Sequence, residues 1–409
     1  MNKKLGLAVA GALLALSSTA NAGITIPAGD WTVDISGNVN AFTNFTKADR
    51  AKGTALTGGI AVGRDANGED RANGINTGLL PAWIGISGKT RQNDLDVAFT
   101  ISFQPNVSEN SAAGDAIGNG SVGQLNRQAF LSFGDASWGT VKLGKDIGIY
   151  ADEAILHDMT LLGVGAVAAA NSGASTTWGG IGTGYQYAAW KGQVAYTTPN
   201  WNGFQATIGV TNPNQGVGAD AIYQDRLGVE GKASYTFTGD VSGKVWTSFA
   251  SYDVSLAKSA YTVDETIKVT AWDIGGNVNY GQFGLTGYYY DGNNNGTTTL
   301  MGNAFKNVGG SVKGRDGDGG YVQATYLLPT NTKLGLAYGI SNLSKASGQT
   351  NAQEAAIVEE NRRWTIGAYH ALTKSLNLVA EYSDIKSEGQ VSSNKQESKN
   401  VSLGAILFF

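Results

Sequence analysis

The sequence contains no cysteine, and among its 409 residues there are only two histidines and six prolines. Without cysteine, neither a disulfide framework nor a thiolate metal site is possible. The histidines, His157 and His370, lie far apart in sequence, so we expect neither to be catalytic. No serine stands in a G-x-S-x-G setting, and no D-x-D-x-D-G calcium loop is present. We therefore predict that the protein is not an enzyme and holds no metal and no cofactor.

Long apolar runs are also missing after the first 22 residues, where no stretch approaches the ~20 residues that a transmembrane helix needs. Only helices and closed β-barrels satisfy every backbone polar group within lipid. If the chain crosses a membrane, it must therefore do so as a barrel. The 58 glycines, with many Asn, Ser, Thr and Tyr residues, are typical of neither a helical nor a disordered chain.

The first residues have the pattern of a secretory signal. Lys3 and Lys4 provide a short basic region, residues 5–16 are apolar, and Ala20 and Ala22 form an A-x-A cleavage arrangement. We predict cleavage after Ala22, with residues 1–22 as signal peptide and 23–409 as one domain. The alternative is an N-terminal membrane anchor, but the apolar run is short for a span. The mature chain would carry 27 basic and 33 acidic residues, a formal charge of −6, with no basic stripe for a nucleic acid.

Alternation of apolar and polar residues is the main pattern of the remaining chain. It begins with Trp31, Val33 and Ile35 against Thr32 and Asp34. The same pattern recurs at 95–104, 204–210, 227–237, 376–382 and 401–409. These segments approach the ~9–11 residues of a tilted membrane strand, whereas strands of soluble sandwiches have ~5–6.

The connections alternate between tight turns and long polar loops, as in outer-membrane barrels. The expected tight turns lie at 90–93, 134–137, 198–202, 238–242, 281–282, 329–332 and 373–374. The segments between the connections number roughly sixteen. We therefore predict an all-β, transmembrane antiparallel barrel with both termini on the short-turn side. Aromatic residues near the turns indicate a membrane-interface girdle: Trp31, Trp138, Trp201, Tyr235, Phe237, Tyr280, Phe283, Tyr326 and Phe409.

Three segments carry a family resemblance: the hairpin at 126–145, the strand, turn and strand at 193–204, and the terminal strand at 401–409. In order and spacing they resemble the Gram-negative trimeric general porins over nearly the whole mature chain. The resemblance implies a homotrimer in the outer membrane, in contact with its lipid and lipopolysaccharide. It also implies that the barrel-assembly machinery recognises Phe409, and that small hydrophilic solutes and ions diffuse through the pore.

The resemblance places a pore-narrowing third loop at about 147–186. Four carboxylates are expected at the constriction: Asp146, Asp152, Glu153 and Asp158. Strand parity points Lys142, Lys191, Arg226, Glu230 and Lys232 inward, and Arg127 matches a wall arginine of the family. Opposed charges across a water-filled neck would create a transverse field. We expect these side chains to face water, so that neutralising them leaves folding nearly intact.

The sequence departs from the family in two places. The loop reads Leu161 to Val167 where some members have Pro-Glu-Phe-Gly, and Trp83 stands where some members place a base. A solvated loop face is therefore the alternative interpretation of the four acids. A substrate-specific channel for a sugar or organic acid is the alternative function, with Tyr185, Tyr187 and residues 288–290 lining the path. A secreted β-rich binding protein is a further alternative.

Overall fold

The computed structural model describes residues 23–49, 52–53, 55–64, 67–105, 107, 124–167, 176–214, 222–223, 225–256 and 266–409. Sixteen strands form an antiparallel barrel that closes where β2 pairs with β21, register Asn38 to Phe408 through Ala48 to Ser398. The predicted all-β barrel is thus confirmed. The sixteen wall strands are β2 (Trp31–Ala48), β4 (Trp83–Gln92), β5 (Leu95–Pro105), β6 (Gln124–Asp135), β7 (Gly139–Ile147), β8 (Trp190–Thr197), β9 (Phe204–Thr211), β11 (Gly228–Phe237), β12 (Val241–Leu256), β13 (Thr266–Tyr280), β14 (Phe283–Asn293), β17 (Gly317–Leu327), β18 (Thr332–Leu343), β19 (Val358–Ala371), β20 (Leu376–Gly389) and β21 (Lys395–Phe408).

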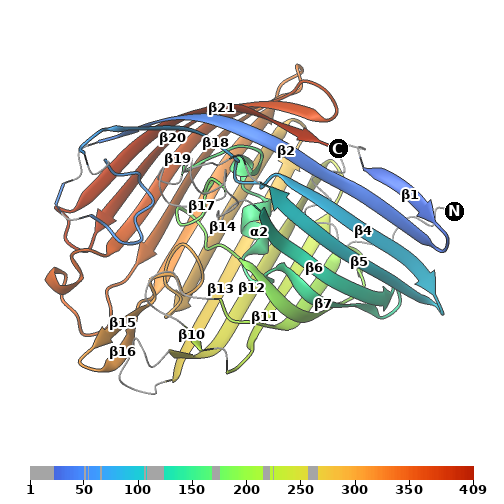
Figure 1. Ribbon diagram of the computed structural model, residues 1–409, viewed down its shortest axis with the longest axis horizontal. Coiled ribbons are helices and arrows are strands. Elements are labelled where there is room, and N and C mark those ends of the chain that lie inside the picture. Colours follow the sequence, from blue (N-terminus) through green and yellow to red (C-terminus); the bar gives the residue numbers. More distant parts are fainter. Residues whose placement is uncertain are drawn as a thin grey trace.

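Short strands extend this wall at its rims. β1 (Ile24–Ala28) forms a hairpin with the start of β2, and β3 (Arg71–Asn76) pairs with its far end. β10 (Ile222–Tyr223) pairs with β12, and β15 (Phe305–Val308) forms a separate hairpin with β16 (Ser311–Gly314). Figure 1 shows β1 and the C-terminal end of β21 at one end of the barrel, which agrees with the predicted side of the termini.

All seven predicted tight turns connect neighbouring wall strands. At one of them, between β13 and β14, Gly281 has φ +56° with open space around it, a conformation that glycine adopts without steric cost. Many strands are longer than predicted, with 18 residues in β2, so they extend beyond the thickness of a bilayer.

The two faces of the wall differ as the alternation requires. In β14 the outward side chains of Leu285 and Tyr289 are exposed, whereas Thr286, Tyr288 and Tyr290 are buried inside. Exposed apolar side chains recur on the outside of the other wall strands. Near the short turns, aromatic rings pack in pairs, as at Phe283 with Tyr326. Among the described residues, none of the helices is both long and apolar enough to span a membrane.

Candidate pore constriction

The connection between β7 and β8 folds into the barrel. Its described parts, 148–167 and 176–189, include the helix α2 (Asp152–Leu156) and the 3-10 helix η2 (Met159–Leu162). In Figure 1, α2 lies inside the ring of strands. Polar side chains of the opposite wall contact this third loop, so its inward fold agrees with the resemblance-based prediction.

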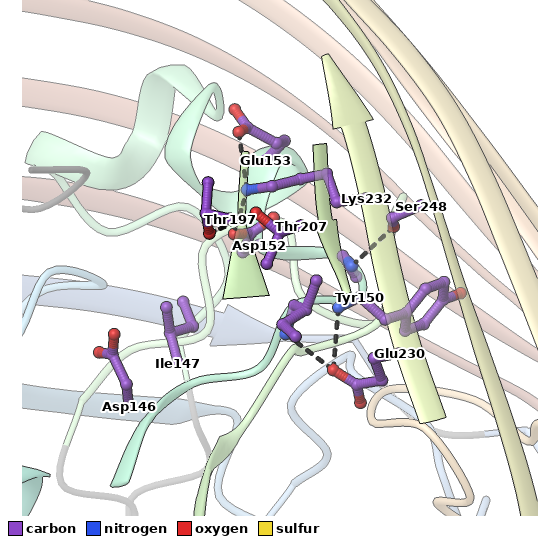
Figure 2. A network of polar contacts seen from close by, with 12 residues as sticks. Asp146, Ile147, Tyr150, Asp152, Glu153, Thr197, Thr207, Glu230, Lys232 and Ser248 are labelled. Atoms are coloured by element: carbon purple, nitrogen blue, oxygen red, sulfur yellow. Dashed lines mark hydrogen bonds and ion pairs between the residues drawn. The ribbon is translucent and has the colours of Figure 1, made fainter. Parts of the chain in front are cut away.

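A wall carboxylate fixes the beginning of the loop. Glu230, on β11, is fully buried and accepts hydrogen bonds from the backbone N–H groups of Ile149 at 2.7 Å and Tyr150 at 3.0 Å. It also binds Lys191 Nζ at 2.7 Å and accepts from the Tyr252 hydroxyl. Figure 2 shows the Glu230 carboxylate directed at the loop backbone. A buried charge is tolerated when such donors surround it.

The acids of α2 bind lysines of the wall. Asp152 Oδ2 lies 2.5 Å from Lys232 Nζ on β11, and Glu153 Oε1 lies 2.9 Å from the same nitrogen. Glu153 also pairs with Lys244 on β12. The ammonium of Lys232 reaches both carboxylates from the wall (Figure 2). Both acids are buried, and their ion pairs with the wall lysines attach the loop to the wall. This corrects the expectation that they face water across a neck.

The two adjacent acids differ in proton affinity. Burial raises the pKa of Asp152 to about 6, and Lys232 offsets only part of that effect. Burial also acts to raise the pKa of Glu153, but Lys232 and Lys244 together outweigh it and lower that pKa to about 2. His157 stacks on Trp246 with ring centroids 4.5 Å apart, and burial lowers its pKa. At neutral pH the group therefore holds two carboxylates, two ammonium groups and a neutral imidazole.

Other wall strands hold the middle of the loop. The Tyr321 hydroxyl donates to the carbonyl of Ala154 at 2.8 Å. Gln323, also on β17, accepts from Met159 N–H and donates to the His157 carbonyl.

Glu381, on β20, accepts from the N–H groups of Val164 at 2.9 Å and Gly165 at 2.7 Å, and from the Tyr369 hydroxyl. Together with Glu230, it shows that wall carboxylates bind the loop backbone at two separated places. Sequence reasoning placed Glu230 on the inner face without this role, and it missed Glu381. The inward parity of β20 was the available signal for Glu381.

The other two predicted constriction acids have different roles. Asp146 belongs to β7, where it pairs with Lys142 at 2.5 Å and accepts from Gln128, so this pair lies within the wall. Asp158 caps η2 by accepting from Thr160 N–H, and it also accepts from Gly180 N–H and the Tyr185 hydroxyl. It therefore holds two parts of the loop together.

Three of the predicted inward lysines lie inside, and each is bound to an acid: Lys142 to Asp146, the buried Lys191 to Glu230, and Lys232 to Asp152 and Glu153. Arg226 does not lie on the inner wall as predicted. It precedes β11, its side chain is half exposed, and it lies beside Asp225. Parity placed it on the inner wall only by extending β11 two residues too far.

Arg127 reaches the interior through a strand irregularity. The pairing of β5 with β6 passes from Ser102–Gln128 to Phe103–Asn126, which leaves Arg127 as an extra residue. Such a bulge changes the direction of a side chain relative to strict alternation. The guanidinium lies 5.9 Å above the Trp190 ring. Strict alternation in β6, where Leu131 points outward, would instead place Arg127 on the outer face.

Two further segments contact the third loop from inside. Residues 77–82 follow β3, where Leu79 and Leu80 donate backbone hydrogen bonds to Gly163 and Leu161. In the loop after β14, the Thr298 carbonyl accepts a hydrogen bond from Tyr187 N–H. Other backbone carbonyls of the same loop accept hydrogen bonds from the Gln186 side chain. Neither contact could be read from the alternation. Together with the third loop, these segments narrow the interior.

The remaining predicted site residues are terminal. Ala20 and Ala22 lie outside the described residues. Phe409 follows β21 and exchanges two backbone hydrogen bonds with Gly37, at 2.8 and 3.0 Å, at the seam that closes the barrel.

Comparison with known proteins agrees with this architecture. The family model described as Gram-negative porin matches residues 7–390. The structure is similar to the outer membrane channel DcaP of Acinetobacter baumannii, with TM-score 0.68 and 14% identity over 94% of this chain and 99% of that one. It is also similar to an anion-selective porin from Comamonas acidovorans, with TM-score 0.61 and 17% identity over 93% and 100%. OmpF of Salmonella typhi gives TM-score 0.58 and 15% identity over 93% and 100%.

No curated protein matches the sequence. The solved structures show the fold, and the family model covers most of the chain. The barrel, its apolar outer face and its narrowed interior are those of a diffusion channel in the outer membrane. The chain belongs to the Gram-negative porin family.

Proposed function

We propose that small hydrophilic solutes and ions pass through the space that the third loop leaves, and that the charges fixing this loop set the ion selectivity. The carrying observation is the group of Asp152, Glu153, Lys232 and Lys244, which joins the loop to the wall inside the barrel. Salt screens charges only over distances longer than the Debye length, which is about 8 Å in physiological salt. An ion passing within that distance of these side chains therefore feels their charge with little screening. Local charge should therefore decide selectivity more than the net charge of the chain.

The test compares reversal potentials of single channels in a salt gradient. Asp152→Asn with Glu153→Gln leaves two unbalanced lysines, so the reversal potential should shift toward anions. Lys232→Gln with Lys244→Gln leaves two unbalanced acids and should shift it toward cations. The variant with all four changes restores local neutrality and should return close to wild type. Asp225→Asn with Arg226→Gln, outside the constriction, is the matched control.

Unchanged reversal potentials in both double variants would overturn the proposal. All four side chains are partly or fully buried, so each variant must first be shown to fold. Breaking a buried pair costs about 3–5 kcal/mol, and the heat-dependent migration of the barrel in detergent reports that loss.

We further propose that the mature protein begins at Gly23, is a homotrimer and catalyses nothing. The A-x-A arrangement at Ala20 and Ala22 supports the cleavage. OmpT of Vibrio cholerae, a similar fold with TM-score 0.53, is described in a trimer form. Recognition of Phe409 by the assembly machinery and contact with lipopolysaccharide belong to the same proposal.

A substrate-specific channel is the second candidate function. Tyr288 and Tyr290 are buried inside the barrel, and Tyr185 and Tyr321 pack with ring centroids 5.7 Å apart. Tyr289 points outward and is 43% exposed, so only part of the tyrosine run faces the interior. Liposome swelling separates the two functions, because a general pore discriminates by solute size whereas a specific one saturates.

A further inference from the structure

Most lysines that point into the barrel have an acid beside them. Five inward lysines of the described wall strands each lie within ion-pair distance of a carboxylate: Lys89, Lys142, Lys191, Lys232 and Lys244. Opposite charges at such close range largely cancel each other's field at a distance. An ion in the pore therefore feels little of the charge of any one of these lysines.

Lys333, on β18, differs from these five lysines. It points inward, because Leu334 and Leu336, which have the opposite parity, are exposed on the outer face. No carboxylate of the described residues forms an ion pair with its ammonium group. That group lies instead 5.3 Å from the centroid of the Tyr369 ring, and Tyr369 is its direct neighbour on β19. The positive charge of Lys333 is therefore not cancelled by an adjacent acid.

Tyr369 can hold this ammonium group without neutralising it. The face of an aromatic ring attracts a cation through its quadrupole but carries no net charge. The ring is 3% exposed, and its hydroxyl donates to Glu381 at 2.6 Å. Glu381 in turn is buried and accepts from the N–H groups of Val164 and Gly165. The ring that positions Lys333 is thus fixed by the same carboxylate that anchors the third loop.

The place of Lys333 along β18 puts it beyond the constriction. It is the second residue of the strand, directly after the tight turn at 329–332. The third loop approaches β18 farther along, where a Cβ on Gly335 would lie 2.6 Å from the sulfur of Met159. Lys333 therefore lies between the loop and the short-turn rim of the barrel. Its side chain is partly exposed, so a hydrated ion can approach it there.

We propose that Lys333 favours small anions over cations at the short-turn mouth of the pore. The inference rests on the proposed passage of ions, and it adds a determinant of selectivity outside the charges that fix the third loop. Chloride, phosphate and small carboxylates form the class of solute that this charge attracts. Loss of one uncompensated charge within a Debye length of the path should lower the anion-to-cation permeability ratio roughly two- to fivefold.

The absence of cysteine from the sequence allows the charge at this position to be set chemically. Lys333→Cys introduces a single thiol, which is largely uncharged at pH 7. The readout is the chloride-to-potassium permeability ratio, taken from single-channel reversal potentials of the full protein in a potassium chloride gradient. The unmodified variant should show the two- to fivefold lower ratio.

Three methanethiosulfonate reagents then distinguish charge from size. The 2-aminoethyl reagent restores a positive charge and should return the ratio close to the wild-type value. The 2-sulfonatoethyl reagent adds a negative charge and should lower the ratio further. The 2-hydroxyethyl reagent adds similar bulk without charge and should leave the ratio of the unmodified variant unchanged. A ratio that does not follow the charge of the attached group would overturn the proposal.

Lys386→Cys is the matched control, since Lys386 lies on β20 with a side chain 35% exposed and has the parity opposite to the buried Ile385. Its thiol should react with all three reagents, as seen by mass measurement, without any change in the ratio. Compact migration before heating shows that each variant is folded. If the thiol at 386 reacts and that at 333 in a folded barrel does not, position 333 does not face the aqueous pore, and the proposal is overturned.

The outcomes also separate this inference from the proposed function. A permeability ratio that follows the charge at 333, with wild-type reversal potentials in both double variants of the third-loop group, would support Lys333 and overturn selectivity by the loop charges. The converse result would overturn the role of Lys333 alone. A protein that conducts no ions would overturn both.

Discussion

At the scale of single residues, the interior of this barrel uses carboxylates as fixed acceptors for a loop. Glu230 and Glu381 each accept from two consecutive backbone N–H groups, so each satisfies donors that would otherwise be buried without partners. In the other direction, Asp152 and Glu153 extend from the loop to Lys232. The same interactions that hold the loop therefore also place charge beside the pore.

Selectivity should depend on pH through Asp152. Because burial raises its pKa to about 6, Asp152 is ionised at pH 7.5 and gains a proton as the pH falls through 6. Glu153 keeps its charge there, since its pKa is about 2. Lowering the pH from 7.5 to 5 therefore protonates the Asp152 carboxylate and should shift the reversal potential toward anions.

Asp152→Asn should abolish most of this pH-dependent shift and should already resemble the low-pH wild type at pH 7.5. His157 is the other titratable group beside Glu153, and burial lowers its pKa below the ordinary value, while its protonation would shift the reversal potential in the same direction. His157→Gln is therefore the control, and it should retain the transition near pH 6. An unaltered transition in Asp152→Asn would assign it to another group.

At the scale of elements, the third loop should depend on its anchor on β20. Glu381→Gln keeps an acceptor but loses the charge that receives Val164 N–H, Gly165 N–H and the Tyr369 hydroxyl. Hydrogen bonds to charged groups contribute about 1.5–3 kcal/mol. The part of the third loop around Val164 and Gly165 should therefore detach from β20 more often. We expect added current noise and brief conductance changes in single-channel recordings.

The matched control is Glu397→Gln, whose carboxylate lies 3.5 Å from Lys386 at a position about one-third exposed. Recordings of this variant should show no more current noise than those of the wild type, because exposed ion pairs contribute little to stability. Equal noise in the two variants would argue against an anchor at Glu381.

The closing seam between β2 and β21 should tolerate little added volume. A Cβ on Gly37 would lie 2.2 Å from the Trp83 carbonyl oxygen and 2.8 Å from the Phe409 ring. Gly37→Ala should therefore destabilise the barrel by about 1–3 kcal/mol, seen as a lower temperature for the loss of compact migration. Gly287→Ala, on β14 with open space around its position, should leave that temperature unchanged.

At the scale of the whole molecule, the exposed apolar band should make the protein inseparable from lipid without detergent. We expect mature protein to begin at Gly23 by N-terminal sequencing, and unboiled protein to migrate as a trimer that heating dissociates. Release by osmotic shock, or a monomer by mass measurement in mild detergent, would contradict this prediction. The physical reason is that exposed side chains such as Leu285, Leu336 and Leu403 would be solvated unfavourably in water.

The sequence by itself determined the barrel. Side chains of a strand alternate strictly between two faces, so a wall between lipid and an aqueous interior is readable as a period of two. Turn chemistry is equally local, and the expected turn at 281–282 lies between β13 and β14. Strand number, the order of long and short connections and the side of the termini follow from these local signals.

Only the tertiary structure decided which charges meet at the constriction. Glu381 binds a loop more than 200 residues earlier in the chain, and Glu230 binds residues 80 positions away. Neither partner has a local pattern, because the backbone N–H is common to every residue except proline. The bulge that turns Arg127 inward arises from pairing with β5, which the sequence of β6 alone does not contain. Alternation assigns a side chain to a face of the wall, whereas the folding of the loop across the interior selects its partner and so determines whether the charge is neutralised.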